Sequence, residues 1–420
     1  MTPFELVCAV LFVLAIVHTF STKYFEHLAH LQPRHAGLWH WLGEVEVVFG
    51  FWALVLAIAM VAMLGTKAAV DYIDNRNYTE PMFVFAVMVI AATRPILQAA
   101  TALVQWLARA VPLGGSLGYY LVVMVMVPLM GSFITEPAAM TLAALILGSR
   151  FFARNLSTRL KYATLGVLFV NISIGGTLTS FAAPPVLMVA AQWGWDTPFM
   201  AATFGWKAAI AVLVNSVGVS VVFRKELAAL PLQTGTKKNA APPVPLLLVA
   251  VHLAFLVGVV VFAHHPPIFM GLFLFFLGIT HAYEHHQDRL ILKEGLLVAF
   301  FLAGLVVLGG QQQWWLQPLL MGMSSDAVFV GAIALTAVTD NAALTYLGSL
   351  VEGLSDSFKY ALVAGAVTGG GLTIIANAPN PAGIAILRPH FHEGVVHPLG
   401  LLLAALPPTV VAAAAFWVFR

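Results

Sequence analysis

Two acidic residues, Glu136 and Asp340, lie inside long apolar stretches of the sequence. An acid at the centre of a bilayer costs at least ~2.5–3.5 kcal/mol, so each needs a proton or a partner there. Pro137 follows Glu136, and proline suits the first turn of a helix, where its missing N–H is not needed. The pattern predicts two re-entrant helical hairpins whose tips, at mid-depth, expose an acid and backbone carbonyls. These are hard oxygen ligands for a small cation. The alternative is that each acid ends an ordinary span at the interface.

Two glycine-rich stretches, 175–176 and 369–371, interrupt other apolar segments, and prolines follow at 184–185, 379 and 381. Glycine permits an unwound backbone, and proline restarts or prevents a helix. Such backbone is tolerated at membrane depth only where protein buries it or a wet cavity adjoins it. The hydroxyl and amide side chains in or beside these stretches are Thr177, Thr179, Ser180, Thr373, Asn377 and Asn380. The stretches predict two unwound helices that face the hairpin tips, although such glycines also serve as packing contacts.

The hairpin and glycine motifs form an internal repeat. TEPAAMT at 135–141 aligns with TDNAALT at 339–345, and GGTLTSFAAPP at 175–185 aligns with GGGLTIIANAP at 369–379. Both pairs occur in the same order, and their offsets differ by a loop length. Each half is expected to contain five crossings and one hairpin, and an odd number of crossings inserts the second half upside down. Inverted repeats with interrupted helices indicate a transporter whose site lies at the midplane.

The composition indicates that lipid covers the chain. Of 420 residues, 60% are hydrophobic and 9% are charged, and the mean hydropathy is +0.92. A soluble domain carries roughly a quarter charged residues. Several apolar runs reach the ~20 residues that a helix needs to cross a bilayer, which favours an all-α polytopic membrane protein over a barrel. The net charge of +2 gives no reason to expect nucleic-acid binding, and the single cysteine, Cys8, excludes an intrachain disulfide.

The positions of lysine and arginine predict the topology, because cytoplasmic loops carry an excess of both. The first inverted repeat, 1–223, has spans near 3–20, 45–66 and 81–108, a hairpin at 118–149, a broken helix at 162–192 and a span at 198–223. A cytoplasmic linker occupies 224–243. The second repeat, 244–420, has spans near 245–263, 267–280 and 294–308, a hairpin at 326–350, a broken helix at 358–387 and a span at 398–419. About ten crossings result, with both termini outside. Residues 81–108 are long for one span and leave open a span plus an interfacial helix.

Other charged residues are weaker candidates. Glu44 and Glu46 begin a span, where interfacial anchoring is favoured over a role in proton entry. Arg94 pairs with a buried acid, binds an anionic substrate or marks the end of a span. Lys207 is expected to extend its ammonium group to the interface. His281, His285 and His286 with Glu284 have the composition of a metal cluster, but a solvated loop is favoured.

The two motif pairs resemble those of the ion-transporter superfamily, and the chain is most similar to its sodium/proton antiporter branch. GGTLTSFAAPP is similar to the superfamily's Gly-Gly-x-x-Thr…Pro-Pro signature, and TDNAALT to its Asp-Asn hairpin tip. The resemblance covers about 118–223 and 326–419. It implies an elevator-like or rocking carrier, often a homodimer, with ions held between hairpin tips and unwound helices. By this resemblance the tip residues are Thr135, Glu136, Thr339, Asp340 and Asn341, and the unwound residues are Thr177, Thr179, Thr373 and Asn377.

The sequence departs from the superfamily pattern in two ways. The Ser-Asn-Thr carboxylate motif of the divalent-anion branch is absent, which argues against a dicarboxylate substrate. The first tip carries Glu-Pro where Asp-Asn is more usual, so the two tips are not shown to be equivalent.

We therefore expect a sodium (monovalent cation)/proton antiporter of the inner cell membrane, with Asp340 as the principal carboxylate and Glu136 as its repeat partner. Burial favours a protonated carboxyl group, whereas a bound cation favours the carboxylate. Na⁺ and H⁺ then compete for one group, which is sufficient for antiport.

No cofactor is expected. The alternatives are an anion carrier of the same superfamily, such as an arsenite or carboxylate permease coupled to sodium, and a membrane enzyme that uses the histidines. Acids at both tips disfavour an anion site, which would offer Arg, Lys or helix N-termini instead.

Overall fold

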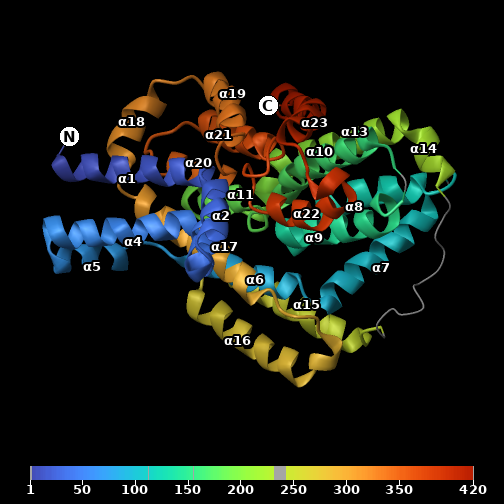
Figure 1. Ribbon diagram of the computed structural model, residues 1–420, viewed down its shortest axis with the longest axis horizontal. Coiled ribbons are helices and arrows are strands. Elements are labelled where there is room, and N and C mark those ends of the chain that lie inside the picture. Colours follow the sequence, from blue (N-terminus) through green and yellow to red (C-terminus); the bar gives the residue numbers. More distant parts are fainter. Residues whose placement is uncertain (1, 112, 155, 231–242, 420) are drawn as a thin grey trace.

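The computed structural model of the chain describes residues 2–111, 113–154, 156–230 and 243–419. Most of the predicted linker, including Lys237 and Lys238, lies outside these residues. The described residues contain helices and no strand. The chain is an all-helical polytopic membrane protein (Figure 1).

The helices of the first half are α1 (Pro3–Phe20), α2 (Thr22–Leu31), α3 (Ala36–Leu42), α4 (Val45–Leu64), α5 (Thr66–Asp74), α6 (Thr79–Ala91), α7 (Arg94–Ala110), α8 (Leu117–Ile134), α9 (Glu136–Leu147), α10 (Thr158–Gly175), α11 (Pro184–Trp193), α12 (Thr197–Met200), α13 (Trp206–Val222) and α14 (Arg224–Ala229). Those of the second half are α15 (Leu246–Val261), α16 (Pro266–Ala282), α17 (Leu292–Gly309), α18 (Gln313–Met321), α19 (Ser325–Thr336), α20 (Asn341–Ser349), α21 (Asp356–Gly369), α22 (Asn380–Leu387) and α23 (Pro398–Val418).

Six of the described helices are long and apolar enough to cross a membrane. They are α1, α4, α8, α17, α23 and the continuous run Thr197–Val222, which contains α12 and α13. The helices α15, α16 and α19 are apolar but shorter. The total of about ten crossings remains a prediction.

The segment predicted at 81–108 consists of two helices. Helices α6 and α7 meet at a break of two residues and are bent by 65°. Arg94 begins α7, and Pro95 occupies its first turn, where a helix tolerates proline. Within one continuous helix, Pro95 could not donate to the carbonyl four residues earlier and its ring would clash with that carbonyl, which explains why the chain does not continue as one straight helix.

Glycines let the central helices approach closely. A Cβ added to Gly304 of α17 would lie 2.3 Å from the backbone nitrogen of Gly50 in α4. A Cβ on Gly365 of α21 would lie 2.5 Å from the carbonyl oxygen of Phe329 in α19. Small residues at such contacts replace the hydrophobic driving force that lipid does not supply between helices.

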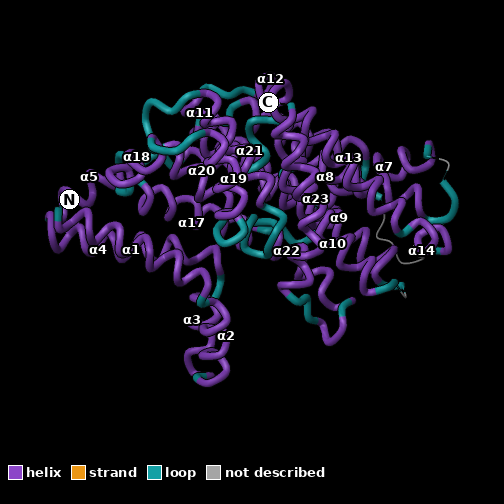
Figure 2. The backbone as a smooth tube through the Cα atoms, turned by 90° about the horizontal axis from the view of Figure 1, so that it is seen from above, coloured by secondary structure: helices purple, strands orange, loops and turns teal. Residues whose placement is uncertain are grey.

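Helices α2 and α3 project from the body of the molecule as a pair (Figure 2). The sequence had indicated only a connection between two spans here. The two helices are separated at Gln32 and Pro33, and the Trp39 indole Nε1 donates a hydrogen bond of 3.0 Å to Gln32 Oε1. The Phe25 and Trp39 rings stack with centroids 6.2 Å apart. Aromatic packing therefore organises a segment whose sequence lacks a long apolar run.

Hydrogen bonds between helix ends that are far apart in the sequence fall into two sets. One set joins Ser157 to Glu226, with the Ser157 N–H donating at 2.6 Å, and the Lys161 ammonium to the His390 carbonyl at 2.8 Å. The other joins the Tyr72 hydroxyl to the Val307 carbonyl at 2.6 Å. A further contact of that second set runs from the Gln192 amide to the Ser349 carbonyl at 2.5 Å. Each contact links segments that the predicted topology places on the same side of the membrane.

Candidate ion-binding site

The first hairpin turns at Thr135, between α8 and α9. Thr135 has φ 69° and ψ 151°, a conformation that costs a residue with a side chain of order 1–3 kcal/mol. Its carbonyl accepts the first helical hydrogen bond of α9 from the Ala139 N–H at 3.0 Å. The Thr135 side chain is 2% exposed, and its hydroxyl oxygen has no hydrogen-bond partner. Strained backbone that persists at a buried polar position is typical of a functional site.

Glu136 begins α9 and is fully buried. Its Oε2 atom accepts a hydrogen bond of 2.8 Å from the Asn377 side-chain amide, whereas Oε1 has no partner within the part of the chain that the structure describes. A Cβ added to Gly176 would lie 2.5 Å from that Oε1 atom, so only glycine leaves room for the carboxyl group. The first hairpin tip thus fits against both unwound stretches.

The first unwound stretch begins where α10 ends at Gly175 and lasts until α11 begins at Pro184. Ser132 of α8 supports it: its hydroxyl donates to the Gly175 carbonyl at 2.7 Å and accepts from the Leu178 N–H at 2.9 Å. The Thr179 hydroxyl donates to the Ser132 carbonyl at 2.6 Å. The Thr177 hydroxyl donates to the Ile174 carbonyl at 2.7 Å. Both threonines therefore use their protons on backbone oxygens.

The second hairpin tip has a different geometry. Asp340 is the N-cap of α20, and its Oδ1 atom accepts from the N–H groups of Ala342 and Ala343 at 2.8 and 3.2 Å. Asp340 is half-buried, as is Thr339. Asn341 is fully buried, and its backbone N–H donates to the Ala376 carbonyl at 3.1 Å. Its carboxamide donates to the Ser173 hydroxyl at 3.5 Å.

The second unwound stretch lies between Gly369, the end of α21, and Asn380, the start of α22. The Thr373 hydroxyl donates to the Ala337 carbonyl at 2.9 Å. The Asn380 amide donates to the carbonyls of Gly370 and Thr373, both at 2.8 Å. These bonds satisfy carbonyls that a helix would otherwise satisfy, and so they stabilise the interruption.

The two halves repeat one packing contact. A Cβ on Gly175 would lie 2.5 Å from the Pro128 carbonyl oxygen, and a Cβ on Gly369 would lie 2.6 Å from the Ile333 carbonyl oxygen. In each half, the last glycine of the helix therefore packs on the first helix of the preceding hairpin. Thr179 and Thr373, which align in the repeat, both donate to carbonyls at the end of that same helix.

Several buried oxygens of this region accept no hydrogen bond from the described residues. They are Thr135 Oγ1, Glu136 Oε1, Asn341 Oδ1, Asn377 Oδ1 and Asn380 Oδ1. A buried acceptor without a partner costs about 1–3 kcal/mol. A small hard cation prefers carboxylate, amide and hydroxyl oxygens as ligands. The donor set therefore fits a cation.

Glu136 and Asp340 are the acids at the two hairpin tips. Within the described residues, neither Glu136 nor Asp340 forms an ion pair. A concentration of negative charge without a protein cation attracts a proton or a metal ion.

Comparison with known proteins agrees with this chemistry. Residues 3–419 match the model of a family described as "Putative Na+/H+ antiporter". The chain belongs to this family. The match confirms the prediction of a sodium/proton antiporter and supports a transporter rather than an enzyme. No match was found among curated proteins. The wider resemblance to the ion-transporter superfamily remains a prediction.

The supporting hydroxyl of Ser132 in the antiporter was missed by the sequence argument. Ser132 precedes Thr135 by three residues, and Thr336 precedes Thr339 by three. A hydroxyl residue three positions before the tip threonine in both halves is a pattern that could have identified this position from the sequence. Ser173, whose hydroxyl donates to the Val367 carbonyl at 2.7 Å, has no counterpart in the second half and could not have been found in this way.

The remaining charged candidates lie apart from the contacts just described. Lys207 does not extend to the interface as predicted; it is 4% exposed, and its ammonium group donates to the Tyr360 hydroxyl at 2.9 Å. The Tyr360 ring, 4.4 Å away, offers a cation–π contact that explains why the ammonium group stays inside. Glu44 pairs with Lys293 at 3.4 Å, and Arg94 marks the break between α6 and α7.

The histidines of the segment 281–286, for which a solvated loop is favoured over a metal cluster, lie largely at the surface. His281, His285 and Glu284 are exposed at the end of α16 and beyond it. Among the residues searched, which are those the structure describes, no group of three His, Cys, Asp or Glu side chains is placed to hold a metal ion.

Proposed function

We propose that the antiporter exchanges Na⁺ for H⁺ at the Glu136 carboxyl group, between the first hairpin tip and the two unwound stretches. One observation carries the proposal: Glu136 is fully buried, and its Oε1 atom has no partner among the described residues while Asn377 holds Oε2. A carboxylate in this position requires a cation, and a carboxylic acid requires a proton. The site therefore accepts either, and not both at once.

The surrounding residues act as further ligands and as supports in this proposal. Asn377 fixes the orientation of the carboxyl group by donating to Oε2. The carboxamide oxygens of Asn341, Asn377 and Asn380 supply neutral ligands. Neutral oxygens with one carboxylate suit a monovalent ion, because they balance a single positive charge.

Asp340 takes a second role. We had expected it to be the principal carboxylate, but its Oδ1 atom is already engaged in capping α20. Its Oδ1 atom accepts from two backbone N–H groups, which makes Asp340 a structural residue of the second tip. Glu136 is therefore the better candidate for the exchanged proton, with Asp340 as a structural partner.

The repeat supplies a framework for alternating access. We infer two inverted halves, 1–223 and 244–420, joined by a cytoplasmic linker at 224–243, with about ten crossings in the inner cell membrane. The repeated contacts of Gly175 and Gly369 support this relation. Each hairpin packs on its own unwound stretch while Asn377 reaches across to Glu136. A movement of one half against the other, in a monomer or a homodimer, would open the site to either side.

Flux in proteoliposomes tests the function. Addition of Na⁺ or Li⁺ outside should drive protons out and alkalinise the lumen in either orientation of the protein, and Glu136→Gln should abolish the response. Glu393→Gln, at an exposed acid, is the matched control. Proton flux that survives Glu136→Gln unchanged would reject the site. A response to oxyanions instead of cations would establish the anion carrier.

A further inference from the structure

A row of three cavities leads from the surface toward the first hairpin tip. The widest has a volume of about 450 Å³ and is lined in part by the exposed residues Asn75, Asn77 and Gln192. It shares Glu80 and Ala191 with a second cavity of about 120 Å³. The shared lining residues place the two cavities side by side.

Polar groups line one part of the 120 Å³ cavity. Glu80 and Thr79 come from the first turn of α6, Ser180 comes from the first unwound stretch, and Thr197 begins α12. The Ser180 and Thr197 hydroxyl oxygens are 3.3 Å apart. The Asn77 amide donates to Glu80 Oε1 at 3.3 Å and so helps to orient the carboxyl group. One carboxylate and several hydroxyls form the same kind of hard donor set as the central site.

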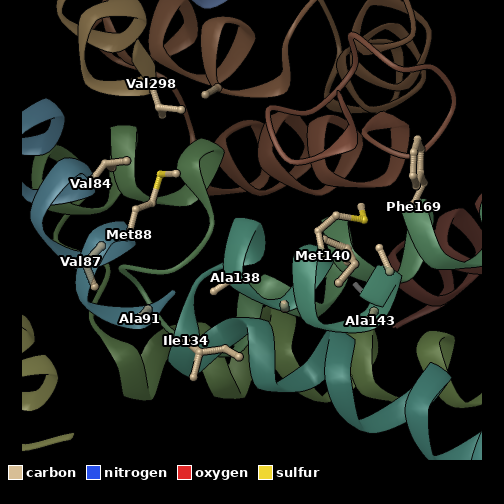
Figure 3. Close-up of a cluster of buried hydrophobic side chains, with 14 of the residues drawn as sticks. Val84, Val87, Met88, Ala91, Ile134, Ala138, Met140, Ala143, Phe169 and Val298 are labelled. Carbon is tan, nitrogen blue, oxygen red and sulfur yellow. The ribbon is translucent and has the colours of Figure 1, made fainter. Parts of the chain in front are cut away.

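The third cavity, of about 10 Å³, contacts Thr135 and Pro137, the residues on either side of Glu136. It shares Phe181 and Leu187 with the 120 Å³ cavity. Its other walls are apolar and include Val84, Met88 and Val298, which lie near one another beside the hairpin in Figure 3. A cavity needs about 10–15 Å³ to hold one water molecule. An ion cannot pass here unless a side chain moves.

We propose that the 120 Å³ cavity is a peripheral binding station for a hydrated monovalent cation, with Glu80 as its carboxylate, and that Phe181 and Leu187 form the barrier between this station and Glu136. The station rests on the proposed function, since it feeds the site of exchange. The cavity has several times the volume that one water requires, so an ion enters it with part of its hydration shell. Beyond the barrier, protein oxygens must replace that shell.

The charge around the station favours a cation over an anion. Arg76 lines the wider cavity and not the 120 Å³ cavity. His264 borders the 120 Å³ cavity and is exposed. The residues that line the 120 Å³ cavity include the Glu80 carboxylate and no lysine or arginine.

Cysteine labelling tests the station without relying on transport. Cys8 is the only cysteine of the chain, so Cys8→Ser provides a background free of thiols. In that background, Thr197→Cys should react with a membrane-impermeant methanethiosulfonate added from one side only. Na⁺ at ten times its dissociation constant should slow the reaction about tenfold, because about a tenth of the sites then remain empty.

The Glu80 carboxylate is tested by adding a second change. Glu80→Gln should remove the protection by Na⁺, whereas Asp74→Asn, at an exposed acid of α5, should leave it intact. Labelling that Na⁺ does not slow, or protection that survives Glu80→Gln, would overturn the station. Protection by an oxyanion instead of Na⁺ would also overturn it. If Thr197→Cys does not fold, Ser180→Cys reports on the same cavity.

The barrier has its own test. Ala182 lines the 10 Å³ cavity, so the thiol of Ala182→Cys should react with the methanethiosulfonate far more slowly than that of Thr197→Cys. Adding Phe181→Ala should make the two labelling rates similar. Equal rates before Phe181 is changed would reject the barrier. The station and the antiport can fail separately. Na⁺ protection without Na⁺-driven proton flux would reject the antiport alone, whereas flux that depends on Glu136 without Na⁺ protection would reject the station alone.

Discussion

The two hairpin tips share a sequence pattern but differ in what surrounds their acids. Glu136 is buried, with Gly176 against one carboxyl oxygen and Asn377 bonded to the other. Asp340 is half-buried and uses its Oδ1 atom to cap α20. The comparison shows that an acid at a helix start either caps the helix or keeps a carboxyl oxygen for another partner. Which of the two occurs depends on the groups that face the acid.

The two acids differ in their position at the helix start. Thr135 is the N-cap of α9, and Glu136 is the first residue of that helix, whereas Asp340 is itself the N-cap of α20. Helix α20 offers Asp340 the N–H groups of Ala342 and Ala343. Capping therefore satisfies the second acid locally, whereas the first depends on the opposite half of the molecule.

The largest expected effect separates the two acids directly. Glu136→Gln should weaken apparent Na⁺ affinity by at least about 100-fold, because removing one member of a buried charge pair costs ~3–5 kcal/mol. Asp340→Asn should reduce affinity much less, since asparagine also caps helices. The Na⁺ dependence of proton flux in proteoliposomes measures both. Equal losses of apparent Na⁺ affinity in the two variants would show that the two acids do not differ in this way.

The glycine beside Glu136 gives the second test. In Gly176→Ala the new methyl group would lie 2.5 Å from Oε1, so the carboxyl group must move and flux should fall strongly. Gly218→Ala in α13 is the matched control, because a Cβ there meets open space. Full activity in Gly176→Ala, measured at matched protein incorporation, would show that the carboxyl position is not critical.

The amide that holds Glu136 gives a smaller effect with a defined sign. Asn377→Asp places a second carboxyl group against Glu136, and a like charge favours the protonated form. The pH of half-maximal flux should therefore rise, because protons are retained to higher pH. Asn377→Gln keeps the amide and serves as the control. A shift of the pH of half-maximal flux to a lower value would contradict the account.

Much of this arrangement is predictable from the sequence. Residues 118–149, predicted as a hairpin, contain α8 and α9, which together occupy 117–147, and residues 358–387, predicted as a broken helix, contain α21 and α22. That these helices form re-entrant and broken elements of the membrane domain stays a prediction. Glycine and proline fix these interruptions locally, so a single sequence reveals them. The bend at Arg94 and Pro95 was predictable from the sequence for the same reason.

The unequal roles of the two acids were not predictable. Thr-Glu-Pro and Thr-Asp-Asn both indicate an acid at a helix start, and nothing in either motif reports that Asn377 faces Glu136. That contact joins residues 241 positions apart. The helical form of 22–42 was also missed, because its stability depends on aromatic contacts such as that of Phe25 with Trp39.

The smallest expected effect concerns stability. Asp340→Ala should lower the free energy of unfolding by about 1 kcal/mol through loss of the cap, whereas Asp340→Asn should leave it nearly unchanged. Thermal unfolding in detergent compares the two variants. Identical unfolding temperatures for Asp340→Ala and the parent protein would show that the cap contributes nothing.

Proton release on Na⁺ binding tests the central claim most directly. Purified protein in weakly buffered detergent should release protons when Na⁺ is added. Asp340→Asn should retain that release, and Glu136→Gln should lose it. Release of the same number of protons by Glu136→Gln would show that Na⁺ and H⁺ exchange at another group, and the site described above would then be wrong.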